Sequence, residues 1–259
     1  MIPKFIHQIW IQGENLIPAK MKKNMDKIKD MHNDWQYILW DEIAILQLLS
    51  QYGDLEKYYK FIYMHQKIDY AKFVILDVYG GIYIDADAYT KKKLDSLFAM
   101  YSDYDLIISD VSNTRFEKYV LCRDADTCVN NGIIIAKSNS DVLKYLCRNF
   151  KTDCGSFEIK YQCIQNTTGP MIFNALIKNY SGTSKIKILN HKVMEPCVFD
   201  KCDIDDSTYI LHKHEGSWCP KFMITYAKIQ LKHKHIFYCF FIILLIAFFL
   251  SIIYRIYIH

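Results

Sequence analysis

Residues 79–88, which read YGGIYIDADA, constrain the fold more than any other stretch of the chain. Two glycines end an apolar helical pattern, and a short apolar run then leads directly into Asp85 and Asp87. Because side chains alternate along a strand, these two acids would lie on one face of it. Two carboxylates aimed at one point repel each other unless a cation lies between them, so the stretch predicts a strand that ends in a divalent-cation site.

The segments around this stretch alternate between strand and helix patterns. This order predicts an α/β architecture with a largely parallel sheet. Paired acids at the carboxyl end of an apolar strand lie where open α/β sheets bind their ligands. The expected strands are 4–11, 36–40, 82–84, 88–91, 105–109, 131–137, 186–189 and 209–211; the expected helices are 18–31, 41–52, 54–63, 65–79, 140–150 and 170–179; and 110–130 is expected to be a loop.

Composition narrows the class of protein. A chain of 259 residues with 51% hydrophobic content can bury the core of one catalytic domain. The net charge of +4 and the absence of a dense basic run in the body argue against a nucleic-acid partner. The nine cysteines include no Cys-x-x-Cys pair. We therefore expect reduced, partly buried thiols, including at the loosely spaced pairs Cys122/Cys128, Cys147/Cys154 and Cys197/Cys202.

The C-terminal residues have a different character. Residues 236–254 are uncharged and almost wholly apolar, and as a helix they would be about 28 Å long, enough to cross a bilayer core. We expect a catalytic domain at 1–230, a basic juxtamembrane linker at 231–235, a transmembrane helix at 236–254 and a tail at 255–259. Met1 is followed by no signal-peptide pattern, so the body is expected in the cytosol on a tail anchor, with the endomembrane lumen as the alternative.

Three further positions have both a structural and a functional interpretation. Asp69 and Lys72 lie three apart on a helix, where the spacing alone favours a solvated ion pair; the alternative is that Asp69 binds a ribose or base. Trp10 ends a strand and is either a core residue or a platform for base stacking. His7, on the same strand, is expected to satisfy a hydrogen bond in the core.

The segment from His212 to Trp218 is dense in polar side chains near the end of the body. His212 or His214 could supply a nitrogen ligand to an ion held by the two acids. Lys213 could neutralise phosphate charge, and Ser217 with the indole N–H of Trp218 could donate to a diphosphate.

Taken together, these motifs resemble glycosyltransferase family 32, which includes yeast-type initiating α-1,6-mannosyltransferases, inositol-phosphoceramide mannosyltransferases and capsular sugar transferases. The similarity covers residues 2–218 and rests on IPKFIHQIW, the Asp-x-x-basic helix, YGGIYIDAD, NNGIIIA, TGP and the His-rich segment that ends in GSW. It implies a GT-A fold, a UDP- or GDP-sugar donor and Mn²⁺ or Mg²⁺. It further implies transfer of a hexose of the mannose, glucose or galactose type, with retention, to a glycan or glycolipid hydroxyl; a membrane acceptor would suit the anchor.

The resemblance also implies roles for individual residues. Asp85 and Asp87 would bind the metal and act in catalysis together with Lys213. His212 matches the first His of the closing motif and would be the third ligand, with His214 as the alternative. The donor-binding residues would be Trp10 at the base, Asp69, Lys72, Asp85 and Asn131 around the nucleoside and sugar, and Ser217 and Trp218 at the β-phosphate.

Two departures from the family pattern and two rival interpretations stay open. The family usually has Arg at the position of Lys72, and its closing motif usually reads His-His-aromatic rather than His-Lys-His. A phosphohydrolase of the haloacid-dehalogenase type also begins with strand–Asp-x-Asp, but Tyr89 replaces the Thr or Val it requires. A membrane-tethered binding protein for nucleotide sugars or glycans, without catalysis, is the second rival.

Overall fold

The computed structural model describes residues 1–156, 158–199, 201–214, 219–234 and 250. The chain forms two compact units, 1–218 and 219–259. In the second unit the structure describes one helix, α11 (Lys221–Lys232). No helix in the described ranges has both the length and the apolar character needed to span a bilayer. The span expected at 236–254 lies outside the described residues, and the predicted domain limits stay a prediction.

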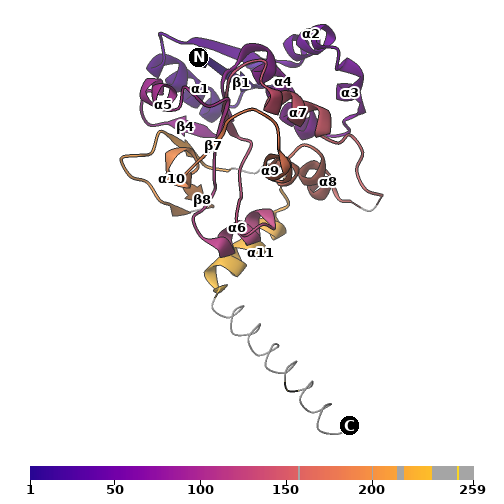
Figure 1. Cartoon of the computed structure of the whole chain (residues 1–259), viewed down its shortest axis with the longest axis vertical. Coiled ribbons are helices and arrows are strands. Elements are labelled where there is room, and N and C mark those ends of the chain that lie inside the picture. The colour runs from indigo at the N-terminus through magenta and orange to yellow at the C-terminus, as the bar shows by residue number, and fades with distance from the viewer. Residues whose placement is uncertain (157, 200, 215–218, 235–249, 251–259) are drawn as a thin grey trace. The chain divides into compact units, whose positions relative to one another are not determined.

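The first unit is built on a six-stranded sheet in the order β2-β1-β3-β6-β5-β7. Figure 1 labels β1 and β7 of this sheet among the surrounding helices. Every neighbouring pair that involves β6 is antiparallel and the other pairs are parallel, so the sheet is mostly parallel, as predicted. A separate ribbon pairs β4 with β10, and a short hairpin pairs β8 with β9. The strands of the main sheet are β1 (Phe5–Ile9), β2 (Gln36–Trp40), β3 (Gly81–Ile84), β5 (Leu106–Ser109), β6 (Ile133–Ala136) and β7 (Ile186–Leu189); the others are β4 (Ala88–Thr90), β8 (Cys197–Val198), β9 (Lys201–Cys202) and β10 (Ile210–His212).

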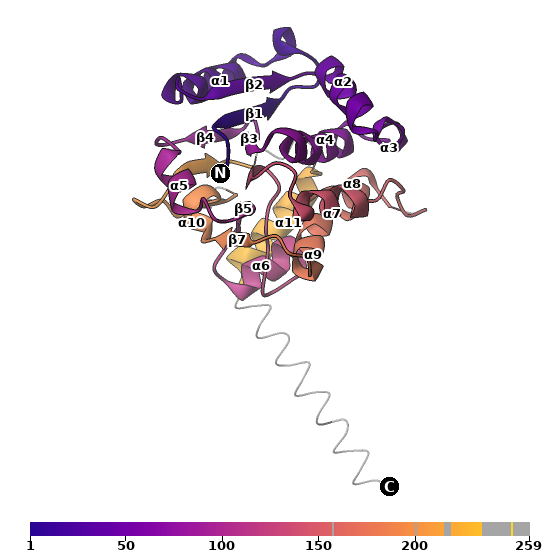
Figure 2. The same cartoon turned by 45° about the horizontal axis from the view of Figure 1, so that its top comes forward.

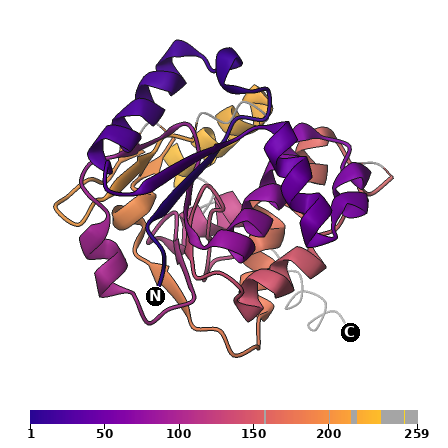
Figure 3. The ribbon, with the colours of Figure 1, turned by 90° about the horizontal axis from the view of Figure 1, so that it is seen from above.

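Helices cover both faces of the sheet (Figure 3). Helix α4 lies against β1 and β3 (Figure 2), and its core continues into α2, α7 and α9. The opposite face packs on α1, α5 and α10. The helices of this unit are α1 (Ala19–Met31), α2 (Glu42–Tyr52), α3 (Leu55–Lys60), α4 (Met64–Tyr79), α5 (Asp95–Met100), α6 (Arg115–Cys122), α7 (Asp141–Asn149), α8 (Lys160–Thr167), α9 (Pro170–Asn179) and α10 (His191–Met194), with a short 3-10 turn, η1, at Glu14–Leu16.

Local sequence signals fix several of these boundaries. Asp41 caps α2, where its carboxylate accepts a hydrogen bond from the Ala44 N–H at 2.9 Å, and Gly53 ends the helix in the left-handed region. Pro170 opens α9 at its first turn, where a missing N–H costs nothing. His7 is fully buried between the Gly80 carbonyl and the Trp40 indole, which confirms its expected core role.

Two expectations about the helices and the cysteines are wrong. The range 110–130 is not all loop, because α6 forms within it, capped by the Thr114 hydroxyl. The cysteines are not all reduced either. Of those in the described residues, Cys147 and Cys219 are free and the others form the disulfides Cys122–Cys128, Cys154–Cys163 and Cys197–Cys202. The β8–β9 hairpin places Cys197 opposite Cys202, a pairing set by strand register that spacing in the sequence does not reveal.

Candidate active site

The two acids are delivered by a tight turn between α4 and β3. Gly80 and Gly81 both have positive φ, at 64° and 98°, which side-chain-bearing residues rarely adopt. A Cβ atom on Gly81 would lie 2.5 Å from the Phe5 carbonyl oxygen, so the close approach of β3 to β1 also requires glycine. The strand therefore leaves the helix end at once and carries Asp85 to its carboxyl end.

Buried amides hold the backbone around these acids. Gln8 donates to the Ile84 carbonyl at 3.2 Å, and Asn24 of α1 donates to the Ala86 carbonyl at 2.9 Å. Both side chains are almost fully buried. The Tyr83 hydroxyl donates to Asp85 Oδ1 at 2.7 Å. The turn is thus fixed from the sheet and from α1, which orients both carboxylates before any ligand binds.

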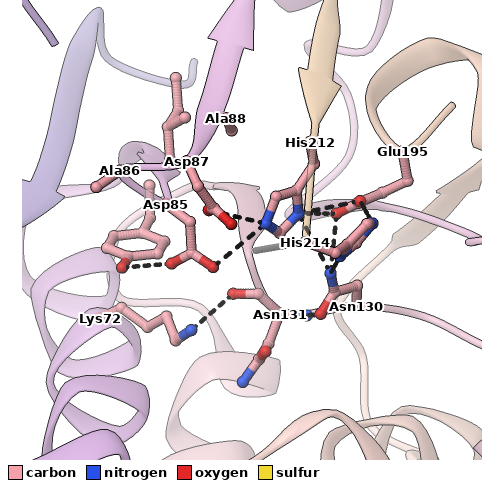
Figure 4. Close-up of polar contacts among 12 residues, drawn as sticks. Lys72, Asp85, Ala86, Asp87, Ala88, Asn130, Asn131, Glu195, His212 and His214 are labelled. Atoms are coloured by element: carbon pink, nitrogen blue, oxygen red, sulfur yellow. Dashed lines mark hydrogen bonds and ion pairs between the residues drawn. The ribbon is translucent and has the colours of Figure 1, made fainter. Parts of the chain in front are cut away.

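His212 joins the acids from the other end of the chain. Antiparallel pairing of β10 with β4 sets His212 opposite Ala88, directly after Asp87. Its Nε2 lies 3.1 Å from Asp87 Oδ1 and 3.7 Å from Asp85 Oδ2 (Figure 4). These three side chains can offer ligand atoms that all lie within 4.8 Å of one another. The predicted candidates Asp85, Asp87 and His212 therefore converge.

The opposite edge of the His212 ring faces a third carboxylate, that of Glu195. Both Glu195 oxygens lie 3.1 Å from His212 Nδ1, and Glu195 Oε2 lies 2.9 Å from His214 Nε2 (Figure 4). Asn130 Nδ2 lies 3.3 Å from Glu195 Oε1 and from each ring's Nδ1. His214 is thus grouped with Glu195, whereas His212 belongs to both groups.

Gly132 makes room for this arrangement. A Cβ atom there would lie 2.3 Å from His212 Cε1 and 2.7 Å from Asp85 Oδ2. Its carbonyl accepts the Asp85 N–H at 2.8 Å. No side chain fits at this position while His212 and Asp85 keep their places.

Asp69 and Lys72 form a buried pair beneath the acids, so the expectation of a solvated pair is wrong. Lys72 is 2% exposed, and its ammonium lies 2.8 Å from Asp69 and 2.9 Å from the Asn131 carbonyl. The Asn131 amide donates back to Asp69 at 3.0 Å, and the Thr168 hydroxyl lies 3.4 Å from the same carboxylate. Segments around residues 131 and 168 cover most of the pair and leave the Lys72 side chain 2% and the Asp69 side chain 13% exposed.

The charges of the cluster are strongly coupled. Burial raises the pKa of Asp85, although Lys72 and His212 act against that rise. Burial alone would lower the pKa of His212, but Glu195 and Asp87 outweigh it and raise that pKa well above its usual value. Burial likewise works to raise the pKa of Glu195, yet the two histidines hold it at about 2. Without a bound cation, a proton on His212 compensates the carboxylates.

The remaining predicted residues lie apart from this cluster or outside the residues that the structure describes. Trp10 follows β1, the neighbour of β3; it is half-buried, and its buried indole N–H has no hydrogen-bond acceptor in the described parts of the chain. Lys213 is exposed, with its ammonium 4.8 Å from the Tyr89 ring centroid. Ser217 and Trp218 lie outside the described residues.

Sequence reasoning missed several residues that build the site. Asn130 and Gly132 flank the predicted Asn131, so the NNG motif contained their signal. Glu195 follows α10 in a segment with no motif, and only the fold brings it to His212. Gln8 and Asn24 are amides within a strand and a helix, and nothing local distinguishes them from solvated residues.

Comparison with known proteins agrees with this geometry. Residues 18–109 match the family model described as glycosyltransferase sugar-binding region containing DXD motif. An uncharacterized glycosyltransferase of Acanthamoeba polyphaga mimivirus is 29% identical over 249 residues, which cover 91% of this chain and 90% of the relative. The mannosyl phosphorylinositol ceramide synthase SUR1 of Saccharomyces cerevisiae is 26% identical over 77% of this chain, which spans 48% of that protein.

The fold has a counterpart among solved structures. Mouse xyloside xylosyltransferase 1 superposes with a TM-score of 0.50 at 11% identity, covering 85% of this chain and 100% of that one. Such a likeness establishes the GT-A-like α/β fold and no more. The family model and the curated relatives together identify the chain as a glycosyltransferase that is similar to those carrying a DXD motif and to glycosyltransferase family 32.

Proposed function

We propose that this glycosyltransferase uses a divalent cation to move a hexosyl group from a GDP- or UDP-sugar to a hydroxyl of a glycan or glycolipid at a membrane, with retention at the anomeric carbon. The observation that carries the proposal is the convergence of Asp85, Asp87 and His212 within 4.8 Å at the end of β3. That end of the sheet is where α/β folds bind ligands.

The donor set suits Mn²⁺ or Mg²⁺. Two carboxylate oxygens and one imidazole nitrogen are ligands that Mn²⁺ accepts, and three protein ligands leave positions for phosphate oxygens. When bound, such a cation would supply Lewis-acid stabilisation of the charge that develops on the departing diphosphate. Asp85 and Asp87 would hold it, with His212 as third ligand rather than His214, whose Nε2 is engaged by Glu195.

The donor would lie between β1 and the acids. Trp10 offers an aromatic face and an indole N–H without an acceptor in the described residues, which suits a stacked nucleobase. The Asn131 amide donates a hydrogen bond to Asp69 next to Asp85 and Asp87, and from there the two side chains would position the sugar or ribose. Exposed Lys213 is free to turn from Tyr89 toward phosphate.

The acceptor proposal draws on the relatives and on the apolar run at 236–254. Two matched fungal groups are named mannosyl phosphorylinositol ceramide synthases and inositol phosphoceramide mannosyltransferases. This chain spans only about half the length of those proteins, so mannose and a lipid acceptor are hypotheses for it. An anchor at 236–254 would hold the site near such an acceptor.

The test is nucleotide release by the full chain in detergent, with GDP-mannose, UDP-glucose and UDP-galactose in turn. We expect release from one donor to require Mn²⁺ or Mg²⁺, and Asp87→Asn to lower kcat/KM by at least ~100-fold. Asp77→Asn is the matched control, since Asp77 is a buried acid that bonds Tyr52 at 2.7 Å outside the cluster. Phosphoester turnover without nucleotide release would instead indicate a phosphohydrolase. Metal binding without turnover of any donor would favour a binding protein.

A further inference from the structure

Glu195 occupies a position that the proposed reaction does not yet explain. Its side chain is 1% exposed, it lies directly after α10, and its carboxylate contacts His212, His214 and Asn130. None of these contacts is to Asp85 or Asp87. A carboxylate buried this deeply is costly unless its partners are fixed.

His212 has two ring nitrogens with different surroundings. Nδ1 lies 3.1 Å from both Glu195 oxygens, and Nε2 lies 3.1 Å from Asp87. A carboxylate accepts hydrogen bonds and cannot donate them when ionised, so Glu195 requires an N–H on Nδ1. In the neutral ring the lone pair then lies on Nε2, which points at the two acids.

We propose that Glu195 is a positioning residue that selects the Nε2 lone pair of His212 for the cation. This inference rests on the proposed function, because it concerns the ligand set for the metal. Histidine ligands commonly donate their second N–H to a carboxylate, which fixes the tautomer and the ring orientation. Here the carboxylate comes from a residue 17 positions before the ligand.

His214 and Asn130 hold Glu195 in that orientation. His214 Nε2 donates to Glu195 Oε2 at 2.9 Å, and the Asn130 amide can donate to Oε1 at 3.3 Å. The His214 backbone has a φ of 50°, a left-handed conformation that residues with a side chain rarely adopt. The ring stacks near His212, with centroids 4.0 Å apart. His214 therefore supports the carboxylate and is not itself the ligand.

The test measures Mn²⁺ binding by electron paramagnetic resonance, with full chain in detergent and Mn²⁺ alone as probe. Glu195→Gln is expected to weaken Mn²⁺ affinity by ~10–100-fold. Pulsed measurements on the bound ion should show nitrogen coupling in the wild type and in His214→Gln. That coupling should be lost in His212→Gln and reduced in Glu195→Gln. The matched control Asp77→Asn should keep both affinity and coupling.

The possible failures are distinct. A wild type that binds no Mn²⁺ would overturn the cation in the proposed function and this inference with it. A wild type that binds Mn²⁺, together with Glu195→Gln of equal affinity and unchanged nitrogen coupling, would overturn the role of Glu195 alone. Nitrogen coupling lost in His214→Gln and kept in His212→Gln would assign the ligand to the other ring and would also overturn it.

A second inference follows independently from the disulfides. Disulfides persist in oxidising compartments and are rare in the cytosol. Three lie in the body, and each closes a short loop of the first unit, on α6, on α8 and on the β8–β9 hairpin. We infer that the body matures in an oxidising compartment, the alternative placement rather than the cytosolic one, and that Asn179 there receives an N-linked glycan.

One of the two Asn-x-Ser/Thr glycosylation sequences of the chain is exposed on the surface. Asn179, at the end of α9, and Ser181 are both exposed. In the other sequence, Asn166-Thr-Thr, the Thr168 hydroxyl is buried against Asp69, and Asn166 bonds Glu158 at 2.8 Å. Surface position and an accessible hydroxyl favour Asn179 as the modified residue.

The test expresses the full chain in a eukaryotic host cell. Under denaturing conditions without reductant, the six disulfide cysteines should resist a thiol-reactive polymer, and reduction should expose them. Glycosidase treatment should lower the mass of the wild type and of the matched control Asn166→Gln but not of Asn179→Gln. All cysteines reacting without reductant, or no glycosidase-sensitive mass on the wild type, would overturn the inference.

Discussion

Gly132→Ala probes the packing on which the candidate site depends. The added Cβ would lie 2.3 Å from His212 Cε1 and 2.7 Å from Asp85 Oδ2, whereas ordinary contact begins at 3.4 Å. The ring must therefore move by about 1.1 Å, or the Gly132 backbone, directly before β6, must retreat by as much. Because Gly132 leads directly into β6, which is paired on both sides in the sheet, and its carbonyl accepts the Asp85 N–H, we expect the two side chains to give way.

The expected loss follows from that displacement. A misplacement of ~1 Å in a catalytic group costs on the order of 100-fold, which is about 2.7 kcal/mol in activation free energy. Overpacking in a close-packed core costs a further ~1–3 kcal/mol of folding stability. Gly132→Ala should therefore fold, unfold at a lower temperature, bind Mn²⁺ more weakly and lose ~100-fold in kcat/KM for nucleotide release.

The assay pairs kcat/KM with Mn²⁺ affinity and thermal unfolding, all on the full chain in detergent. Gly155→Ala makes the same chemical change where the nearest atom is Glu158 Cγ at 3.2 Å, on a half-buried but flexible side chain outside the site. It should leave all three quantities close to wild type. A folded Gly132→Ala protein whose Mn²⁺ affinity and kcat/KM stay within threefold of wild type would refute the argument that His212 and Asp85 act from these positions.

Three further changes test the fold around the site. Lys72→Met leaves the Asp69 carboxylate buried without its cation, so it should lower the free energy of unfolding by ~3–5 kcal/mol, measured by urea titration. An unchanged unfolding midpoint would mean that Asp69 is protonated in the folded protein. Burial lowers the pKa of His7 from 6.5 to about 4, so the unfolded chain binds its proton more readily between these values. Stability present above pH 6.5 should fall by about 3 kcal/mol as the pH drops to 4, and His7→Gln should flatten that part of the profile. Asp41→Ala removes the α2 cap and should cost ~1 kcal/mol by thermal unfolding, a loss that Asp41→Asn should largely avoid.

The sequence predicted best where signals are local. The bounds of β2 and α2 matched because a β-rich run, a capping acid and a terminal glycine lie within a few residues of the boundary they define. The glycine pair likewise predicted the end of α4 and the start of β3. Convergence of Asp87 with His212 across 125 positions depends instead on the β4–β10 pairing, which no short segment encodes. The resemblance to the family's closing motif identified His212, whereas Glu195 had neither a motif nor a spacing to mark it.

Burial is the second property that spacing alone does not determine. An acidic and a basic residue three positions apart on a helix predict an ion pair on the surface, because most such pairs lie there. Here the pair lies under segments that arrive from residues 131 and 168, and those contacts make it an interior feature. The same reasoning explains the departure from the family's Arg. The Lys72 ammonium contacts protein groups on several sides, including the Tyr83 ring at 5.0 Å. The compact ammonium fits this space, whereas the planar guanidinium of Arg would need more room.

The balance of charge then gives the strongest physical reason for a cation. Asp69, Asp85, Asp87 and Glu195 crowd one region, and Lys72 is the one fixed cation that pairs with them in the contacts described above. With neutral histidines the group would carry a charge of about −3 in a site of low dielectric, which is unfavourable without compensation. Protonation of His212 supplies part of that compensation, as its raised pKa indicates. A divalent ion at Nε2 would replace that proton and supply more, so metal binding and proton release from His212 should be linked: Mn²⁺ affinity should rise with pH until the ring no longer has a proton to lose.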